Sequence, residues 1–148
     1  MKDKWRQRFM QLADHVSTWS KDPDAQVGSV IVDSYRRVVG LGFNGFPRGV
    51  SDEPIRFTDK MTKLSMIVHA EANAILNANS SVHNCDLFCT RAPCTECTKL
   101  IIQSGITTVC APVPTKPGRW LDDWQYAQQM LKEASVELID PGPEWNFQ

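Results

Sequence analysis

The sequence predicts an α/β layered protein with a five-stranded mixed sheet and helices on both of its faces. Segments with helical periodicity alternate with short β-branched segments in the order α-β-β-α-β-α-β-α-β. A predicted helix of about 14 residues joins the last two strands, which allows a crossover between parallel strands. The chain has 148 residues, the size of one domain, so we expect a single domain over residues 1–148.

The first half of the chain predicts one long helix and a hairpin. Apolar side chains recur at helical spacing before Asp22-Pro23 ends the first helix: Phe9, Leu12, Ala13, Val16 and Trp19. Two β-branched runs flank the turn Tyr35-Arg36-Arg37 and predict a hairpin. The expected elements are a helix over about 4–20, strands over 28–33 and 38–43, and a short helix around 58–64.

The second half predicts alternating helices and strands. A run of strong helix formers follows His69, and another helix follows Pro93, a residue suited to a helix start. Gly105 is typical of the position just after a helix. The expected elements are helices over 70–77, 98–103 and 121–134, and strands over 86–90, 107–113 and 136–140. A proline-rich loop over residues 112–118 precedes the last helix.

Two short motifs contain residue types that bind zinc. His69 offers a ring nitrogen, and Cys94 and Cys97 offer two thiolates at C-x-x-C spacing. Three protein ligands leave one position open for water, as a catalytic zinc requires. Both groups are expected at helix N-termini, where the helix dipole favours thiolate over thiol. The alternative is a closed structural site, with a fourth ligand from Cys85, Cys89 or His83.

Glu71 is the candidate catalytic residue. It follows His69 by two residues, a spacing that suits contact with a zinc-bound water better than zinc ligation. The combination of H-x-E with P-C-x-x-C is the signature of zinc-dependent nucleobase deaminases. Zinc lowers the pKa of its bound water to about 7, so that hydroxide forms at neutral pH. Glu71 would accept the water's proton and pass protons to the pyrimidine N3 and the leaving ammonia.

Composition limits the classes of partner. The net charge is −1 and the isoelectric point is about 6.3, which argues against a nucleic-acid surface. No apolar run approaches the ~18 residues of a membrane span, and no signal-peptide core is visible, so we expect no membrane partner. Three of the five cysteines lie in or beside predicted strands and are expected to be buried thiols: Cys85, Cys89 and Cys110. Such thiols suit a reducing, cytoplasmic location.

Four segments between about residues 20 and 106 carry a resemblance to a known family. They are Ser20-Lys21-Asp22-Pro23 with Gln26-Val27-Gly28; residues 42–52; residues 69–75; and Pro93-Cys94-Thr95-Glu96-Cys97 with residues 99–106. Together they resemble the deoxycytidylate (dCMP) deaminases of the zinc-dependent cytidine deaminase superfamily. The last two segments are shared across the superfamily. The loop Asn44-Gly45-Phe46-Pro47-Arg48-Gly49 is what points to the deoxycytidylate branch.

The resemblance implies a three-layer cytidine-deaminase-like fold and hydrolytic deamination of dCMP to dUMP, which supplies thymidylate synthesis. It implies one catalytic Zn²⁺ per chain, held by His69, Cys94 and Cys97, with Glu71 as the proton shuttle. Asn44 is expected to contact the sugar and Arg48 the phosphate. The implied substrate-binding residues are Asn44, Gly45, Arg48, Ala70 and Lys21. Members of this branch are commonly homohexamers, and many are activated by dCTP and inhibited by dTTP, with Mg²⁺ accompanying a bound effector.

The chain departs from the family pattern after Val109. Many members have an Asp-Lys-Tyr-type segment there that helps to hold phosphate, and residues 110–120 lack it. Lys116 or Arg119 is expected to substitute. Trp120 packs near the base, contacts another subunit or anchors a surface loop.

Three alternatives to dCMP deamination stay open at this point. The first is a deaminase for 5-substituted dCMP. The second is a deaminase for tRNA or single-stranded DNA, which needs a basic channel with stacking aromatic residues. The third is a non-catalytic zinc-stabilised module, against which the presence of Glu71 argues.

Overall fold

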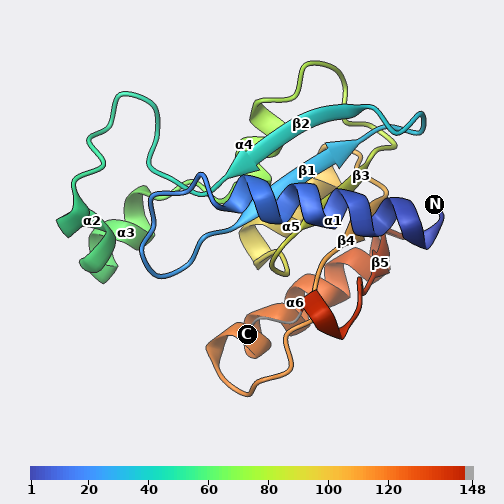
Figure 1. The fold of residues 1–148 in the computed structure, drawn as a ribbon. Helices are drawn as coiled ribbons and strands as arrows, with labels where there is room; N and C mark the ends of the chain where they lie inside the picture. The colour runs from blue at the N-terminus through green and yellow to red at the C-terminus, as the bar shows by residue number, and fades with distance from the viewer. Residues whose placement is uncertain (146–148) are drawn as a thin grey trace.

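The computed structural model describes residues 1–145 and has the predicted α/β architecture (Figure 1). One sheet contains five strands in the order β2-β1-β3-β4-β5. The strands are β1 (Gly28–Val32), β2 (Val38–Phe43), β3 (Asp86–Cys89), β4 (Thr108–Cys110) and β5 (Glu137–Ile139). The helices are α1 (Asp3–Ser17), α2 (Pro54–Thr58), α3 (Lys60–Met66), α4 (Ala70–Leu76), α5 (Thr95–Gln103), α6 (Arg119–Glu133) and the 3-10 helix η1 (Pro143–Trp145).

The strand directions confirm the mixed sheet. Strand β1 pairs antiparallel with β2 and with β3, so the predicted hairpin is present. Strands β3, β4 and β5 are parallel, which confirms the crossover between the last two strands. The single domain over residues 1–148 stays a prediction. Among residues 1–145, no helix is both long enough and apolar enough to cross a bilayer.

Apolar cores cover both faces of the sheet, because successive strand residues point in opposite directions. Val30 and Val32 of β1 pack with Phe9 and Met10 of α1 on one face. Ile31 lies between them in the chain and belongs to the other core. That second core includes residues of three helices: Ala74 of α4, Ile101 of α5, and Trp124, Ala127 and Leu131 of α6. The three layers match the predicted fold class.

Several element boundaries differ from the prediction. The first helix ends at Ser17 because the amides of residues 18–20 bond three residues back, as in a turn. Strand β4 ends at Cys110, since Pro112 and Pro114 have no N–H to continue the ladder. In place of one short helix around 58–64, two helices lie together beyond one end of the sheet: α2 and α3 (Figure 1).

Helix α4 lies directly on strand β2. Gly42 faces the start of the helix, and a Cβ at that position would clash with the Ala70 carbonyl and the Ala74 amide. The residue before the helix is also fixed, because Val68 and Gly45 exchange backbone hydrogen bonds of 2.7 and 3.1 Å. Close backbone approach therefore sets the position of the helix start that carries His69 and Glu71.

Candidate active site

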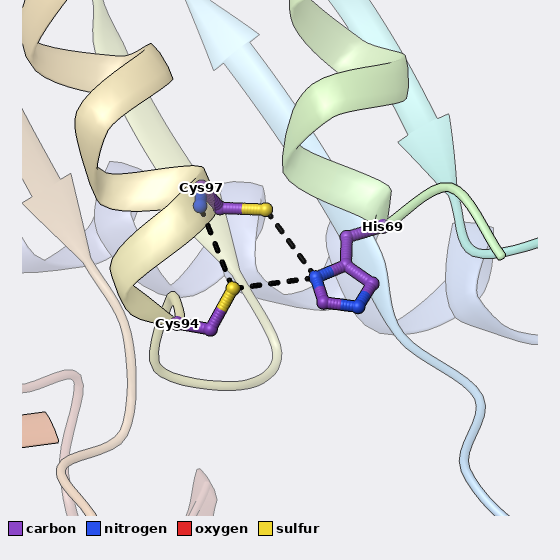
Figure 2. A group of neighbouring side chains, drawn as sticks. All are labelled: His69, Cys94 and Cys97. Carbon is purple, nitrogen blue, oxygen red and sulfur yellow. Dashed lines mark hydrogen bonds between the residues drawn. The ribbon is translucent and has the colours of Figure 1, made fainter. Parts of the chain in front are cut away.

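The three predicted zinc ligands meet in space (Figure 2). His69 Nδ1 lies 3.4 Å from Cys94 Sγ and 3.4 Å from Cys97 Sγ. Within residues 1–145, this trio is the only cluster of His, Cys, Asp and Glu side chains arranged to hold a metal, and its donor atoms all lie within 4.8 Å of one another. A tetrahedral zinc spaces its nitrogen and sulfur ligands roughly 3.6 Å apart, so the three donors fit the ion.

Both ligand groups lie at helix N-termini, as the sequence predicted. His69 is the N-cap residue of α4 and has extended backbone angles. Cys94 is the N-cap residue of α5, and its sulfur accepts a hydrogen bond from the Cys97 amide at 3.4 Å. Because Cys94 caps the helix, α5 begins at Thr95, three residues earlier than predicted from the sequence. The cap places Cys97 one turn along the helix, with its sulfur beside that of Cys94.

The Cys94 sulfur is in an environment that favours metal binding. A hydrogen bond from the Cys97 thiol lowers the pKa of Cys94, and His69 lowers it further. Together they outweigh the effect of burial and bring this pKa to about 4. The same Cys97–Cys94 hydrogen bond, together with burial, raises the pKa of Cys97. Hydrogen bonding to Cys94 also raises the pKa of His69. Cys94 is therefore a thiolate at neutral pH, and thiolate is the form of cysteine that binds metals.

Glu71 lies in the first turn of α4 beside the ligands, and it is 4% exposed. Burial raises the pKa of its carboxyl, although the nearby His69 charge acts in the opposite direction. The Cys89 thiol donates a hydrogen bond to Glu71 Oε1 at 3.4 Å. A carboxyl with a raised pKa is suited to exchange protons with a substrate.

None of the residues considered as a fourth ligand belongs to the cluster. Cys89 is fully buried, and burial raises its pKa well above the usual thiol value, so it stays protonated against Glu71. Cys85 and His83 also lie outside the metal-type cluster. The described residues thus supply three donors, which leaves a coordination position for water.

A pocket opens beside this cluster. Its lining includes His69, Glu71 and Cys94, and two of the predicted substrate-binding residues, Asn44 and Ala70. The loop after β2 and the loops at the starts of α4 and α5 therefore meet at this pocket.

The family assignment follows from comparison with known proteins. A family model described as the cytidine and deoxycytidylate deaminase zinc-binding region matches residues 3–112. The chain belongs to this family. An uncharacterized deaminase of Aliivibrio fischeri is 43% identical over 140 residues, which cover 93% of this chain and 94% of that protein. The human deoxycytidylate deaminase is 46% identical over 112 residues, or 72% of this chain and 63% of the human enzyme, so the match spans less than two thirds of the human protein.

Solved structures support the same assignment. The dCMP deaminase of cyanophage S-TIM5, in complex with dCMP and dUMP, has a TM-score of 0.75 and 26% identity over 95% of this chain and 98% of its own. Its apo form has a TM-score of 0.73 and 25% identity over 95% and 99% of the two chains. These comparisons confirm the cytidine-deaminase fold and the resemblance stated from the sequence. The zinc-binding description of the family confirms zinc as the metal that suits the trio.

In this deaminase, Asn44 fixes one wall of the pocket. It is 6% exposed, and its Oδ1 accepts the Val27 amide at 2.8 Å. Its Nδ2 donates to the Ala25 carbonyl at 2.8 Å and to Asp22 Oδ2 at 3.3 Å. These bonds attach the segment after α1 to the end of β2, so Asn44 orders residues that line the pocket.

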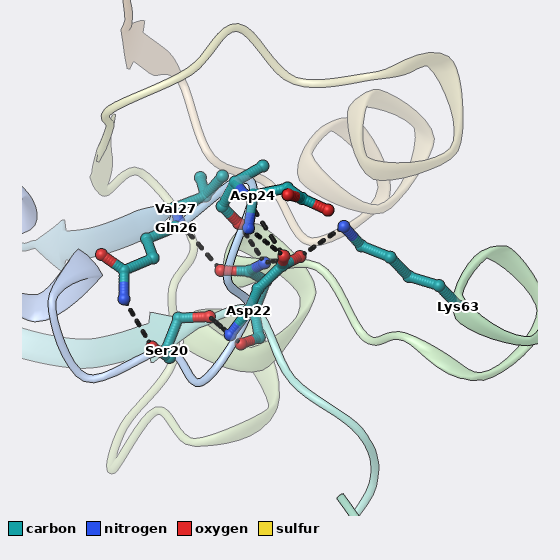
Figure 3. A network of polar contacts seen from close by, with 8 residues as sticks. Ser20, Asp22, Asp24, Gln26, Val27 and Lys63 are labelled. Carbon is teal, nitrogen blue, oxygen red and sulfur yellow. Dashed lines mark hydrogen bonds and ion pairs between the residues drawn. The ribbon is translucent and has the colours of Figure 1, made fainter. Parts of the chain in front are cut away.

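Sequence reasoning missed a buried ion pair in the same wall (Figure 3). Asp22 Oδ2 lies 2.7 Å from Lys63 Nζ, and the two side chains are 0% and 22% exposed. Asp22 Oδ1 also accepts the amides of Asp24 and Ala25. Burial alone would raise the pKa of Asp22, but the hydrogen bonds from Lys63 and the two amides outweigh it and lower the pKa. The available sequence signal was an aspartate before a proline, which predicts a turn and gives no indication of Lys63.

Three predicted substrate contacts lie outside this pocket. Lys21, Gly45 and Arg48 line a neighbouring pocket that also contains aromatic side chains. Arg48 Nη2 donates to Asn77 Oδ1 at 2.8 Å, and Lys21 forms an ion pair with Asp52. Asn44 lines both pockets, so the two are adjacent. The structure therefore separates Lys21, Gly45 and Arg48 from the residues around the zinc ligands.

Two residues from different elements complete the deaminase pocket. Arg91, in the loop before α5, and Trp120, in the first turn of α6, both line it. The Arg91 guanidinium carbon lies 5.0 Å from the centre of the Trp120 ring. Trp120 therefore forms part of the pocket wall. From the sequence, Lys116 or Arg119 was expected to supply the cation for the phosphate. Both side chains are exposed, and neither lines the pocket.

Helix α6 also holds the start of α5. Asp123 accepts hydrogen bonds from the Thr95 amide and the Thr95 hydroxyl, each at 3.0 Å. Thr95 directly follows the ligand Cys94. Asp123 thus satisfies N-terminal donors of α5 and fixes the helix that carries the two cysteines. No motif in the sequence indicated this contact.

Proposed function

We propose that this chain is an enzyme that hydrolyses dCMP to dUMP and ammonia with the help of zinc. The observation that carries the proposal is the buried Glu71 carboxyl beside a three-donor His69, Cys94 and Cys97 site in an open pocket. Several relatives support the nucleotide as substrate, because they are named deoxycytidylate deaminase. The structurally similar cyanophage enzyme was crystallised with dCMP and dUMP.

The chain's own residues supply the proton transfers. Bound zinc would provide Lewis-acid activation of the attacking water. Glu71 accepts a proton from that water and delivers it to N3 of the pyrimidine. It then accepts the proton of the hydroxyl group added at C4 and delivers it to the departing amine, so that C4 keeps a carbonyl oxygen and ammonia leaves. Its burial raises the carboxyl pKa, which favours uptake of a proton from the water. The Cys89 thiol at Oε1 holds the carboxyl in one orientation.

The substrate contacts are proposed from the pocket lining. Ala70 follows the ligand His69 and lines the pocket, so it lies where the base would meet the zinc site. Asn44 lines the same pocket, and we propose that it lies against the sugar. Its amide already bonds to Ala25, Asp22 and Val27, so any sugar contact must use its remaining hydrogen-bonding capacity.

A substrate panel tests the proposal and separates its alternatives. The zinc-loaded protein would be incubated with dCMP, 5-methyl-dCMP, deoxycytidine, dCTP and a cytosine-containing oligonucleotide, and deamination followed for each. We expect kcat/KM for dCMP to exceed that for deoxycytidine by about 100-fold or more, the effect of one or two charge-assisted contacts. Equal rates on the two would overturn the nucleotide assignment, and activity on the oligonucleotide alone would favour the nucleic-acid alternative.

Assembly and regulation remain proposals. We expect a homohexamer regulated by dCTP and dTTP, and a cytoplasmic location, all as the family resemblance and the sequence predicted. Light scattering would give the subunit number, and dCMP saturation curves with and without dCTP–Mg²⁺ would reveal activation. A monomer would contradict the expected hexamer, and unchanged saturation curves would contradict activation by dCTP.

A further inference from the structure

A pocket that takes dCMP needs a cation that can bind the phosphate. A 5′-phosphate carries nearly two negative charges and loses part of its hydration on entering a pocket, so it needs a charged donor. Lys63 and Arg91 are the two Lys or Arg side chains in the described lining. Lys63 is already neutralised, because its ammonium lies 2.7 Å from the fully buried Asp22 carboxylate.

Arg91 has no such partner. None of the ion pairs formed within residues 1–145 involves it, and none of their hydrogen bonds uses its guanidinium. The guanidinium instead lies over Trp120 at 5.0 Å. Stacking on an aromatic ring holds a guanidinium by its face and leaves the N–H donors at its edge free. These donors match a phosphate group in a bidentate arrangement.

The other basic side chains proposed for phosphate are unsuitable. Arg48 donates to Asn77, and Lys21 pairs with Asp52, both outside this pocket. Lys116 and Arg119 are exposed and do not line it. Arg91 is therefore the uncompensated cation of the lining that the structure describes.

We propose that Arg91, held against Trp120, binds the 5′-phosphate and selects the nucleotide over the nucleoside. This inference rests on the proposed deamination of dCMP. Arg91 precedes the ligand Cys94 by three residues, so it lies on the same wall of the pocket as the zinc site without belonging to it. In the substrate, the phosphate lies at the far end of the nucleotide from the reacting C4.

The test is the kinetics of Arg91→Met on dCMP and on deoxycytidine, with Arg119→Met, an exposed arginine that does not line the pocket, as the matched control. We expect kcat/KM for dCMP to fall about 10- to 100-fold, chiefly through KM, because a charge-assisted contact is lost. The deoxycytidine rate should stay within about 2-fold, since its transition state loses no contact. Arg91→Lys should regain part of the loss, and Arg119→Met should behave as the wild type.

A second variant guards against misfolding of Arg91→Met, and a binding measurement tests the phosphate contact without turnover. Trp120→Leu should weaken dCMP selectively but less than Arg91→Met, because the charge stays while its orientation is lost. Calorimetry with the product should show weaker dUMP binding to Arg91→Met and unchanged deoxyuridine binding. Equal losses on dCMP and deoxycytidine, or no loss on dCMP, would overturn the role of Arg91. A wild-type enzyme without preference for dCMP would count against the proposed function itself.

Discussion

The Cys89 thiol donates a hydrogen bond to Glu71 Oε1 across 3.4 Å, and both side chains are buried. The thiol is at the end of β3 and the carboxyl is in the first turn of α4, so the contact joins the sheet to the catalytic helix. It opposes the rise in the Glu71 pKa that burial causes. The pKa of the Glu71 carboxyl is therefore influenced by a residue outside the three-donor cluster.

The first prediction concerns Cys89. In Cys89→Ala the donor to Glu71 is lost, and the pKa of the carboxyl should rise further. Since the carboxylate form must accept the water's proton, the acidic limb of the kcat/KM profile should move to higher pH. Zinc content, measured by atomic absorption, should stay at one ion per chain. Loss of zinc from this variant would mean that Cys89 is a ligand.

The second prediction concerns Glu71. In Glu71→Gln the side chain keeps its size but cannot accept the water's proton. Activity should fall by about 100- to 10,000-fold or more, in line with the loss of general acid–base catalysis. Zinc should be retained, because Glu71 is not part of the three-donor cluster. A metal-free variant would show instead that the carboxyl supports the ion.

The third prediction separates the cysteines. Cys94→Ser and Cys97→Ser should lose zinc and thermal stability together, since the ion joins the starts of α4 and α5. Cys85→Ser and Cys110→Ser are the matched controls, because both thiols are free and buried but lie away from the metal site. The controls should keep zinc even if the melting temperature falls. Zinc loss in a control at a temperature where it stays folded would contradict the assignment.

The fourth prediction concerns the Asp22–Lys63 pair. Lys63→Met leaves the fully buried Asp22 carboxylate without its charge partner and should lower the free energy of unfolding by up to about 3 kcal/mol. Adding Asp22→Asn should recover part of this loss, because the unpaired charge is then removed. Urea unfolding of the wild type, both single variants and the double variant would measure the coupling. Additive effects would show that the pair makes no net interaction.

The fifth prediction follows from the lowered pKa of Asp22. Below its ordinary value of 3.8, an unfolded-state Asp22 takes up a proton while the folded-state carboxylate resists it. Stability from this group is therefore full above pH 4 or so and is lost as the pH falls through the folded-state pKa. Thermal melts between about pH 6 and 2.5 should show a shallower loss for Asp22→Asn than for the wild type. Parallel curves for the two proteins would show that Asp22 does not contribute to the loss of stability in acid.

The sequence predicted the sheet, the zinc trio and the fold, because each depends on local patterns. A continuous β-branched run, Val30-Ile31-Val32, defines β1, and the His69 and Cys94/Cys97 motifs are short and fixed in spacing. The contacts that it missed join distant segments. Lys63 reaches Asp22 only because α3 lies beside the loop after α1, and Asp123 reaches Thr95 only because α6 packs on α5.

The phosphate contact shows the same limit in another way. Arg48 was selected because its loop resembles a family motif, yet the folded loop turns its guanidinium to Asn77. Arg91 is in a loop and belongs to no recognised motif, and in the pocket its guanidinium lies over the ring of Trp120, which comes from α6. A motif identifies residues near a site, whereas the direction of a long side chain depends on neighbours that the motif does not contain.

The close contact between Gly42 and the backbone of α4 gives a strand residue an influence on the position of the active-site helix. A methyl group at Gly42 would push on the backbone of Ala70 and Ala74, on either side of the turn that carries Glu71. His69 and Glu71 would then be displaced together, so activity on every substrate should fall. In a library that substitutes every position, Gly42 should tolerate as few replacements as His69, although it touches neither metal nor nucleotide.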